Sequence, residues 1–253
     1  MQLQALQNKV AVVTGASRGI GRAITKKFAD EGASIVVNYN NSEKEASILL
    51  KEIEGTRGKG VIVKADVSKA ADVKSLVQNS LAAFGRIDVL VNNAGIHYPV
   101  DIFDHSEEMW DQTIDTNLKG AYMCSKEVAP IMLKQEKGKI INISSNSGMY
   151  FPSAMRFAEY VASKAGMNGL TKALALRFGP YITVNAICPG AIVTEMTSFR
   201  DSQANKALIE ETPLKRLGTV EDVANAALFL ASDLSDFITG ELMLVTGGRG
   251  MHQ

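Results

Sequence analysis

The sequence predicts an α/β fold in which seven parallel strands form one doubly wound sheet with helices on both faces. Short runs rich in β-branched residues alternate with longer segments of helical periodicity along the 253 residues. The strand-like runs are continuously apolar, as expected for strands that helices cover on both sides. Repeated strand-helix units with right-handed crossovers produce this arrangement. No linker interrupts the pattern, so residues 1–253 are expected to form a single domain.

Each expected strand is a short apolar run. The first reads KVAVVT and the fifth reads KIINIS, and both are rich in residues that favour strands. The seven expected strands are Lys9–Thr14, Ala33–Tyr39, Gly60–Ala65, Asp88–Asn92, Lys139–Ser144, Ile182–Ile187 and Glu241–Val245.

Glycine and proline mark where the expected helices end. Gly32 follows the first helix, and Gly179 with Pro180 stops the helix after the fifth strand. The expected helices are Ile20–Glu31, Glu43–Glu54, Ala70–Phe84, Glu107–Gln135, Ala158–Phe178 and Val220–Ala231. No regular pattern is expected over about Ala191–Arg216, and so long an excursion in a compact domain predicts a substrate-binding loop.

Composition excludes several classes of protein. The 27 basic and 27 acidic residues balance and form no basic block, so no nucleic-acid partner is expected. Cys124 and Cys188 are far apart without metal-ligand spacing, which predicts buried thiols and no metal site. No apolar stretch reaches the roughly 18 residues of a membrane span, and the N-terminus carries no targeting run. We therefore expect no membrane partner and a cytoplasmic location.

A glycine-rich turn separates the first strand from the first helix, with the sequence TGASRGIG over Thr14–Gly21. Glycines let the backbone approach a pyrophosphate closely, and the start of a helix offers free N–H groups to an anion. The strand-turn-helix context therefore predicts a dinucleotide site. The residues of this turn expected to contact the cofactor are Gly15, Ser17, Arg18, Gly19, Ile20 and Gly21.

The end of the second strand indicates which dinucleotide binds. NAD sites often place a carboxylate there to bind the ribose, but this chain has Asn38 and no acidic residue until Glu43. Arg18 in the glycine turn suits the geometry of a 2′-phosphate. NADP(H) is therefore favoured as the cofactor, with NAD(H) still possible, and Asn38 is expected at the cofactor site.

With these motifs in place, the whole chain resembles the short-chain dehydrogenase/reductase family, which has the Rossmann fold. The turn TGASRGIG, the NNAG sequence Asn92–Gly95 and the pair Pro189-Gly190 are similar to motifs of that family. The resemblance is nearest to 3-oxoacyl-(acyl-carrier-protein) reductases and to sugar and alcohol dehydrogenases. It implies further cofactor contacts at Asp66, Val67, Asn93, Ala94, Gly95, Tyr160, Lys164, Pro189, Gly190, Ile192 and Thr194.

Asn117, Ser145, Tyr160 and Lys164 fall where the family carries its active-site tetrad. Tyr160 and Lys164 are four residues apart on one expected helix, so they share a face. A nearby positive charge favours a phenolate, which predicts that Tyr160 is the general acid or base. Ser145 would hydrogen-bond the substrate oxygen. By resemblance, Lys164 also binds the nicotinamide ribose, and Asn117 kinks its helix and holds a water.

Two alternatives to these residues are present in the chain. The family's serine commonly lies 13 residues before its tyrosine, which matches Ser147, whereas Ser145 directly follows the strand IINIS. Ser145 is preferred and Ser147 is its rival. Tyr122 and Lys126 repeat the Tyr-x-x-x-Lys spacing, and a contact on a helix surface is the favoured interpretation of that pair.

Several other side chains are candidates for the substrate pocket. His97 follows the NNAG sequence and is expected in the pocket wall rather than in catalysis. Asn146 is either at the pocket rim or in a turn. Residues that would line the pocket or belong to the core are Tyr98, Phe151, Met196 and Phe199.

The sequence therefore predicts an NADP(H)-dependent oxidoreductase that moves a hydride between nicotinamide and a carbonyl or secondary alcohol. A 3-oxoacyl thioester is the favoured substrate by resemblance, and a sugar or alcohol is the alternative. A non-catalytic NADP-binding sensor is the alternative of another class, because fold alone does not imply catalysis. Resemblance also implies a homotetramer assembled through the helices that contain Asn117 and Tyr160.

Overall fold

The fold is a seven-stranded sheet with the strand order β3-β2-β1-β4-β5-β6-β7. The structure is a computed structural model that describes residues 4–56, 58–149, 157–197 and 202–250. Each neighbouring pair of strands in the sheet is parallel, which confirms the predicted sheet. The strands are β1 Val10–Val13, β2 Ser34–Tyr39, β3 Gly60–Lys64, β4 Val89–Asn92, β5 Gly138–Ile143, β6 Ile182–Pro189 and β7 Leu242–Val245.

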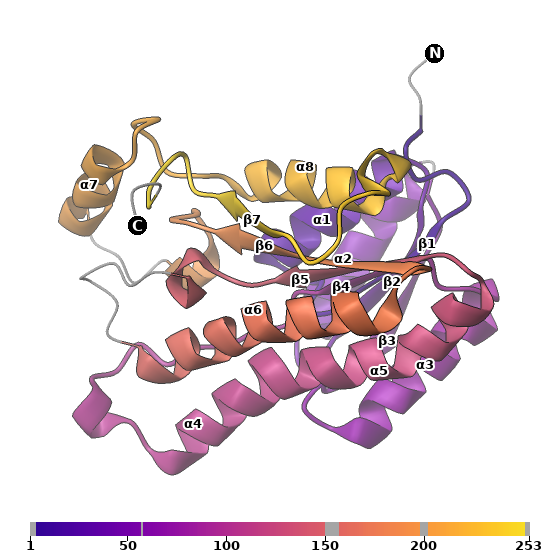
Figure 1. Cartoon of the computed structure of the whole chain (residues 1–253), viewed down its shortest axis with the longest axis horizontal. Coiled ribbons are helices and arrows are strands. Elements are labelled where there is room, and N and C mark those ends of the chain that lie inside the picture. Colours follow the sequence, from indigo (N-terminus) through magenta and orange to yellow (C-terminus); the bar gives the residue numbers. More distant parts are fainter. Residues whose placement is uncertain (1–3, 57, 150–156, 198–201, 251–253) are drawn as a thin grey trace.

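Helices cover both faces of this sheet. Figure 1 shows α1 and α8 on one side and α3, α5 and α6 on the other. The helices are α1 Gly19–Asp30, α2 Glu43–Glu54, α3 Ala70–Phe84, α4 Glu107–Ile114, α5 Gly120–Lys134, α6 Ala158–Phe178, α7 Ser202–Glu211 and α8 Val220–Ala231. The doubly wound α/β prediction is therefore confirmed.

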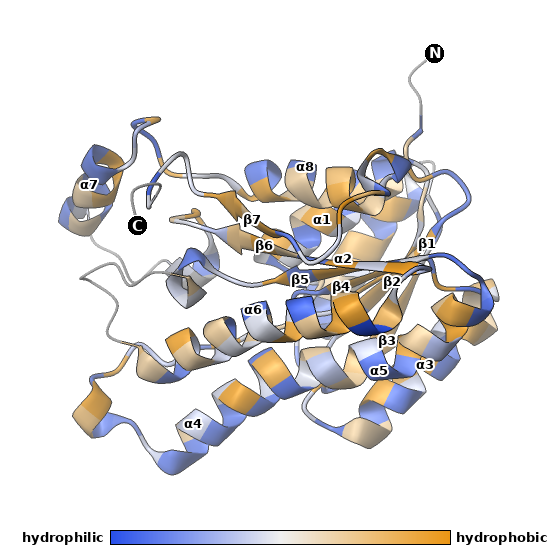
Figure 2. Cartoon of the chain, in the orientation of Figure 1, coloured by the Kyte–Doolittle hydropathy of each residue, from blue (hydrophilic) through white to orange (hydrophobic). Residues whose placement is uncertain are grey.

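Two apolar clusters, one on each face of the sheet, form the core. Neighbouring strand residues alternate between them: Val13 and Val37 pack into the cluster with α1 and α8, while Val12 and Val36 pack into the other. Because both faces are buried, the strand sequences are apolar at successive positions. Figure 2 shows the strands predominantly in the hydrophobic colour and the helices striped.

The strand order reverses between β1 and β4, where chain connections leave the sheet in opposite directions. In such sheets, ligands bind in the crevice outside the carboxyl ends of the strands at this point. The glycine turn follows β1 and the NNAG sequence follows β4. The topology therefore brings the two motifs to the same end of the sheet.

The predicted helix Glu107–Gln135 is one continuous segment in the sequence but not in the structure. A π-helical turn over Asp115–Lys119 separates α4 from α5. Asn117 lies in this wider turn, and its buried side chain hydrogen-bonds the backbone of Ile96. Single π turns of this kind are frequent at functional sites. The change of helix geometry depends on that distant contact, so helical periodicity did not reveal it.

The expectation that Ala191–Arg216 is irregular is wrong in part. The segment contains a 3₁₀ turn over Glu195–Thr197 and helix α7. None of the α7 side chains is buried, so this helix lacks the apolar stripe that identifies a helix in a sequence. Residues 198–201 of the expected substrate loop, and residues 150–156 before α6, lie outside the described residues.

The structure also bears on membrane spans, metal sites and the two cysteines. No helix in the described ranges combines the length and apolar character that crossing a bilayer requires. Within the same ranges, no group of three or more His, Cys, Asp or Glu side chains could hold a metal ion. Cys124 and Cys188 are buried as predicted, and burial raises the pKa of these thiols to about 12 and about 11, respectively. Both thiols therefore stay protonated near neutral pH.

Candidate active site

The glycine turn leaves open space in front of helix α1. Gly15 and Gly19 have positive φ angles of 60° and 53°. A Cβ atom at Gly15 would lie 2.9 Å from the Cα of Ala94, whereas one at Gly19 would have no neighbour within 4 Å. The first turn of α1 carries no acidic residue. A tight turn with free space and helix N–H groups beyond it fits the pyrophosphate of a dinucleotide.

Asn38 holds this turn in place. Its buried side chain accepts a hydrogen bond from Gly15 N at 3.1 Å and donates to Ala65 O at 3.0 Å. The backbone carbonyl of Asn38 accepts a further bond from Ala16 N. The side chain predicted to contact the cofactor thus joins β2, the glycine turn and the residue after β3.

The NNAG sequence is joined to the glycine turn by side chains of both motifs. The Thr14 hydroxyl accepts hydrogen bonds from Asn93 N at 2.9 Å and Ala94 N at 3.1 Å. In return, Asn93 Nδ2 donates to the carbonyls of Thr14 and Gly15, each at 3.0 Å. Thr14 was not among the predicted site residues, although it is the first residue of the TGASRGIG turn. Its hydroxyl role depends on a strand distant in the sequence.

Asp66 and Val67 follow β3 at the edge of the same crevice. Asp66 Oδ1 accepts hydrogen bonds from the backbone N and the hydroxyl of Ser68 at 3.0 and 2.7 Å. Burial raises the pKa of Asp66, but those hydrogen bonds and the charge of Lys69 outweigh it, so the pKa lies below its ordinary value. Val67 is buried against Gly120, where a Cβ atom would lie 2.9 Å from Val67 Cγ2. Asp66 is therefore a fixed, ionised carboxylate.

The segment after β6 is also well anchored at its start. Gly190 N donates to Val245 O at 3.0 Å, and Ile192 is buried and pairs with Gly218. Thr194 N donates to the hydroxyl of Thr197 at 3.0 Å. These contacts hold the residues that follow Pro189 in a fixed position beside β7.

Lys164 is the buried charge of the site. Its side chain, in a residue only 4% exposed, donates a hydrogen bond from Nζ to Ile143 O at 2.8 Å. Burial lowers the pKa of Lys164 to about 8. The ammonium lies 5.6 Å from the centroid of the Tyr160 ring on the same helix. The predicted shared face of Tyr160 and Lys164 is confirmed.

Asn117 brings a further segment to Lys164. It accepts a hydrogen bond from Ile96 N at 2.8 Å and donates to Ile96 O at 2.9 Å and to Ser163 Oγ at 3.1 Å. A Cβ atom at Gly95 would lie 3.3 Å from Asn117 Oδ1 and 3.7 Å from Lys164 Nζ. Only a glycine leaves this space beside the ammonium free.

The two rival serines lie side by side. Ser145 Oγ donates to Ser147 Oγ at 3.0 Å and accepts a hydrogen bond from Ser147 N at 3.2 Å. Both residues are buried; Ser147 lies in the 3₁₀ turn Asn146–Gly148 that follows β5, and Ser145 caps the start of that turn. Asn168 Nδ2 donates to Gly148 O at 3.0 Å and so fixes this turn on α6. Because the two hydroxyls lie next to each other, the structure leaves both Ser145 and Ser147 as candidates for the catalytic serine.

Comparison with known proteins decides the family. A family model described as enoyl-(acyl carrier protein) reductase matches residues 15–250. The 3-oxoacyl-(acyl-carrier-protein) reductase FabG of Staphylococcus epidermidis is 43% identical over 245 residues, which cover 96% of this chain and 100% of that protein. This chain belongs to the short-chain dehydrogenase/reductase family. It is an oxidoreductase that acts on CH–OH and C=O groups with a nicotinamide cofactor.

Solved structures of short-chain dehydrogenases/reductases have the same fold. One from Mycobacterium marinum is 32% identical, with a TM-score of 0.91 and 98% of each chain covered. A 7α-hydroxysteroid dehydrogenase, solved with NADH and 7-oxo glycochenodeoxycholic acid, is also 32% identical, with a TM-score of 0.92. That comparison covers 98% of this chain and 96% of the other. The family thus includes relatives with different substrates.

The remaining candidates of this short-chain dehydrogenase/reductase have varied positions. Tyr122 and Lys126 are exposed on α5, which confirms the helix-surface interpretation. The His97 ring packs against Phe157 and Tyr160, with centroid distances of 5.4 and 5.9 Å, as expected for a wall residue. The Tyr98 hydroxyl donates a hydrogen bond to Gln112, and Asn146 is buried in the 3₁₀ turn. The side chains of Phe151, Met196 and Phe199 lie outside the described residues.

Replacing Gly148 by alanine should both destabilise the protein and reduce its activity. The new Cβ atom would lie 2.5 Å from the backbone carbon of Lys164, so α6 or the serine turn must move. We expect a loss of about 1–3 kcal/mol in the free energy of unfolding, measured by urea denaturation. Gly169→Ala is the matched control, since a Cβ atom there meets nothing within 4 Å. It should stabilise α6 by about 0.5–1 kcal/mol, and equal effects of the two changes would contradict this packing.

Replacing Lys164 by methionine should separate activity from stability. The pKa of Lys164 falls from 10.5 to about 8 because of burial, a penalty of about 3 kcal/mol that Lys164→Met removes. Ile143 O would lose its donor, at a cost of about 1–3 kcal/mol. We therefore expect a change of less than about 2 kcal/mol in unfolding free energy at pH 7, with turnover lost.

The pH dependence of this comparison has a definite sign. A base whose folded pKa is lowered costs stability fully below that pKa, and the cost fades as pH rises toward the unfolded value. The stability of Lys164→Met relative to the wild type should be highest below pH 8 and decline between pH 8 and 10.5. Urea denaturation at several pH values measures it, and an advantage that grows with pH would be inconsistent with a buried ammonium.

Proposed function

We propose that this protein is an NADP(H)-dependent reductase of 3-oxoacyl thioesters, such as those on acyl carrier protein, that uses Asn117, Ser145, Tyr160 and Lys164. The observation that carries the proposal is the buried Lys164 ammonium 5.6 Å from the Tyr160 ring, on the wall of the dinucleotide crevice. The substrate class rests on the 43% identity to a relative of that activity over nearly the whole chain.

The bound cofactor would supply a hydride to the carbonyl carbon, and the protein then has to control the oxygen. Negative charge develops on that oxygen as the hydride arrives, so a positioned donor must deliver a proton to it. Tyr160 would give its phenolic proton in reduction and take one in oxidation. Ser145 would donate a hydrogen bond to the same oxygen and stabilise its charge.

Lys164 and Asn117 would support this proton transfer. The ammonium favours the phenolate that Tyr160 becomes once its proton has left. Because Nζ is buried and fixed on Ile143 O, its charge acts in a medium that screens it weakly. Lys164 would also donate to the nicotinamide ribose, and Asn117 would hold the water that returns a proton. Both roles are carried over from the family.

The glycine turn and the crevice edge would bind the rest of NADP(H). The proposed contacts are Gly15, Ser17, Arg18, Gly19, Ile20, Gly21, Asp66, Val67, Asn93, Ala94, Gly95, Pro189, Gly190, Ile192 and Thr194. Asn38 would act through the turn that it holds. Arg18 has an exposed side chain at the start of α1, and its guanidinium lies 3.9 Å from the Glu195 carboxylate. It is therefore accessible to a 2′-phosphate.

We also propose the homotetramer and the single domain. Helices α4, α5 and α6 carry exposed large apolar side chains at Trp110, Tyr122 and Leu176, the last 88% exposed. An interface through these helices would cover such side chains, and sedimentation velocity measures the assembly. The cytoplasmic location stays a prediction.

A dehydrogenase of alcohols is the second candidate function. The observation in its favour is the structural similarity to a hydroxysteroid dehydrogenase, whose substrate is not a thioester. The non-catalytic NADP-binding sensor is disfavoured, because binding of the cofactor alone does not require a buried ammonium beside a tyrosine.

A screen of NADPH oxidation tests the proposed function. Acetoacetyl thioesters, aldoses and small ketones are offered to the purified protein, and loss of NADPH absorbance is followed. We expect the fastest turnover with acetoacetyl thioesters and a loss of at least about 10²-fold in Tyr160→Phe, because a general acid contributes about 10²–10⁴-fold. NADPH binding should remain, and Tyr122→Phe should retain activity. Preferred turnover of a sugar would support the alternative dehydrogenase, and binding without any turnover would support the sensor.

The two serines are distinguished by parallel substitution. If Ser145 contacts the developing oxyanion, Ser145→Ala should lower kcat by about 10²–10³-fold. Ser147→Ala should have a smaller effect, because Ser147 would only orient Ser145 through the 3.0 Å hydrogen bond. A larger loss of kcat in Ser147→Ala would reverse the assignment.

Cofactor preference is tested at Arg18. Wild-type protein should have a lower KM for NADPH than for NADH, and Arg18→Ala should raise the NADPH value alone, by about tenfold, since charged hydrogen bonds contribute about 1.5–3 kcal/mol. Lys26→Ala is the control, because that exposed lysine on α1 pairs with Glu52 away from the turn. A lower KM for NADH in the wild type would refute the NADP preference.

A further inference from the structure

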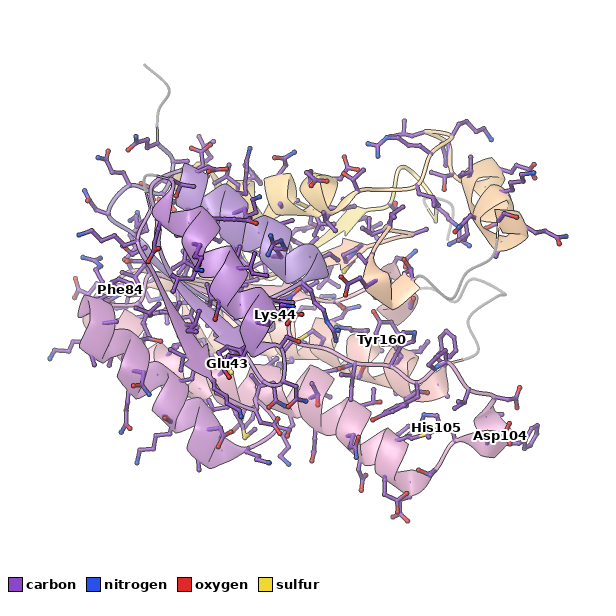
Figure 3. The ribbon with its side chains drawn as sticks, turned by 180° about the vertical axis from the view of Figure 1, so that it is seen from behind. Glu43, Lys44, Phe84, Asp104, His105 and Tyr160 are labelled. Atoms are coloured by element: carbon purple, nitrogen blue, oxygen red, sulfur yellow. The ribbon has the colours of Figure 1, made fainter. Side chains whose placement is uncertain are left out.

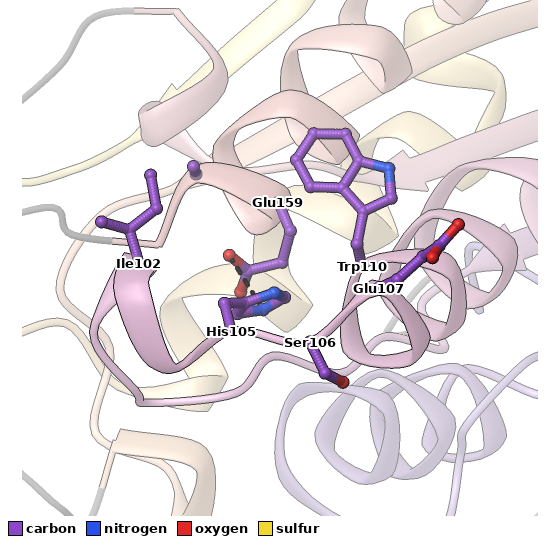
Figure 4. Close-up of a pocket in the computed structure, with 7 residues that line it drawn as sticks. Ile102, His105, Ser106, Glu107, Trp110 and Glu159 are labelled. Atoms are coloured by element: carbon purple, nitrogen blue, oxygen red, sulfur yellow. Dashed lines mark ion pairs between the residues drawn. The ribbon is translucent and has the colours of Figure 1, made fainter.

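A buried histidine–carboxylate pair lies next to Tyr160 and has no place in the proposed chemistry. His105 Nε2 lies 3.4 Å from Glu159 Oε2, and the two side chains are only 9% and 2% exposed. Figure 4 shows the Glu159 carboxylate directed at the His105 ring, beside a cavity that Trp110 and Ile102 also line. The pair is therefore an internal contact.

The pair joins two segments that are distant in the sequence. His105 follows the 3₁₀ turn Ile102–Asp104, in the connection between β4 and α4. Glu159 is the second residue of α6, and Tyr160 is the third. Figure 3 shows the labels of His105 and Tyr160 at the same end of the molecule. The pair thus fixes the first turn of α6, the turn that carries Tyr160, to the β4–α4 connection.

Two aromatic rings of the β4–α4 connection contact His105 and Tyr160. The Tyr98 ring packs edge-on against His105, with centroids 6.2 Å apart. The His97 ring lies 5.9 Å from the ring of Tyr160. A shift of the first turn of α6 would therefore disturb the contacts of Tyr160 with His97 and of Glu159 with His105 together.

Stability alone does not account for this pair. A buried polar or ionic pair seldom stabilises a fold more than apolar side chains of similar volume, since both groups must leave water. Neither Glu159 Oε1 nor His105 Nε2 makes a hydrogen bond within the described residues, so both polar groups are only partly compensated. The position of Glu159 in the first turn of α6 adds a favourable interaction with the helix dipole. What the pair supplies is a defined direction for the start of α6.

We propose that His105 and Glu159 are positioning residues whose pair sets the place of the Tyr160 hydroxyl relative to Lys164. The inference rests on the proposed function, in which Tyr160 transfers the proton. Small errors in the position of a reacting group are costly, since a displacement of about 1 Å can cost about 10²-fold in rate.

The test compares variants that remove the pair with one that keeps a polar side chain of the same shape at position 159. Glu159→Leu should lower kcat for the substrate found in the screen by about tenfold or more. Its KM for that substrate and its Kd for NADPH should stay within about twofold, because neither His105 nor Glu159 belongs to the glycine turn. Glu159→Gln should retain most of kcat, since the amide keeps the shape of the carboxylate and an oxygen that faces His105. Glu107→Gln is the matched control, an exposed carboxylate beside the same cavity, and should be unchanged.

A double variant keeps the test informative if Glu159→Leu fails to fold. His105→Leu with Glu159→Leu leaves neither buried polar group without its partner, so it should fold while kcat stays low. Wild-type kcat in that double variant would overturn the proposal, as would equal losses in Glu159→Gln and Glu159→Leu.

A spectroscopic titration separates this inference from the proposed function. Tyrosinate absorbance is followed with pH in each variant and in the same variant carrying Tyr160→Phe, and the difference reports Tyr160 alone. Glu159→Leu should shift that ionisation upward, as the hydroxyl moves away from the Lys164 charge, and Glu159→Gln should not. If the pKa of Tyr160 is unchanged in Glu159→Leu, the positioning role is refuted even in an active enzyme. If that pKa shifts in a protein that turns over no carbonyl, only the proposed function is refuted.

Discussion

The buried ammonium of Lys164 is the constraint on which the arrangement of the site depends. A charge removed from water must be compensated locally, and here Ile143 O accepts its hydrogen bond at 2.8 Å where β5 ends. The remaining cost is visible in the pKa of about 8. Because α6 must hold this side chain over the end of β5, the position of that helix on the sheet is narrowly fixed.

Small residues and amides surround the charge for the same reason. Gly148 allows the 3₁₀ turn with Ser147 to approach the backbone of Lys164 more closely than any side chain would permit, and Gly95 places no Cβ atom between Asn117 and the ammonium. Asn117 connects the first of these to α6 through Ile96 and Ser163, and Asn168 connects the second. Hydrogen bonds of this kind rigidify a site when every partner is satisfied. The site is thus assembled from the NNAG segment, the π turn with Asn117, the turn with Ser145 and Ser147, and α6, and each of these segments is held by contacts with another.

Much of this was predictable because it follows local rules. Strands buried on both faces read as apolar runs, and Tyr160 and Lys164 share a face because they are four residues apart in a helix. Helix α7 was missed since it buries no side chain, and the π turn at Asn117 was missed since it depends on Ile96. The roles of Asn38 and Thr14 in holding the glycine turn were likewise invisible, because their partners lie on other strands.

The sequence by itself determined the sheet, its helical layers, the dinucleotide turn and the tyrosine–lysine pair. Each of these is encoded by a pattern of residues that lie close together in the chain. Tertiary structure alone decided which polar side chains meet. It placed Ser145 against Ser147, and His105 against Glu159 across 54 positions of sequence. The physical reason is that burial removes water as a partner, so a polar group must find whichever complementary atom the packing of distant elements brings within reach.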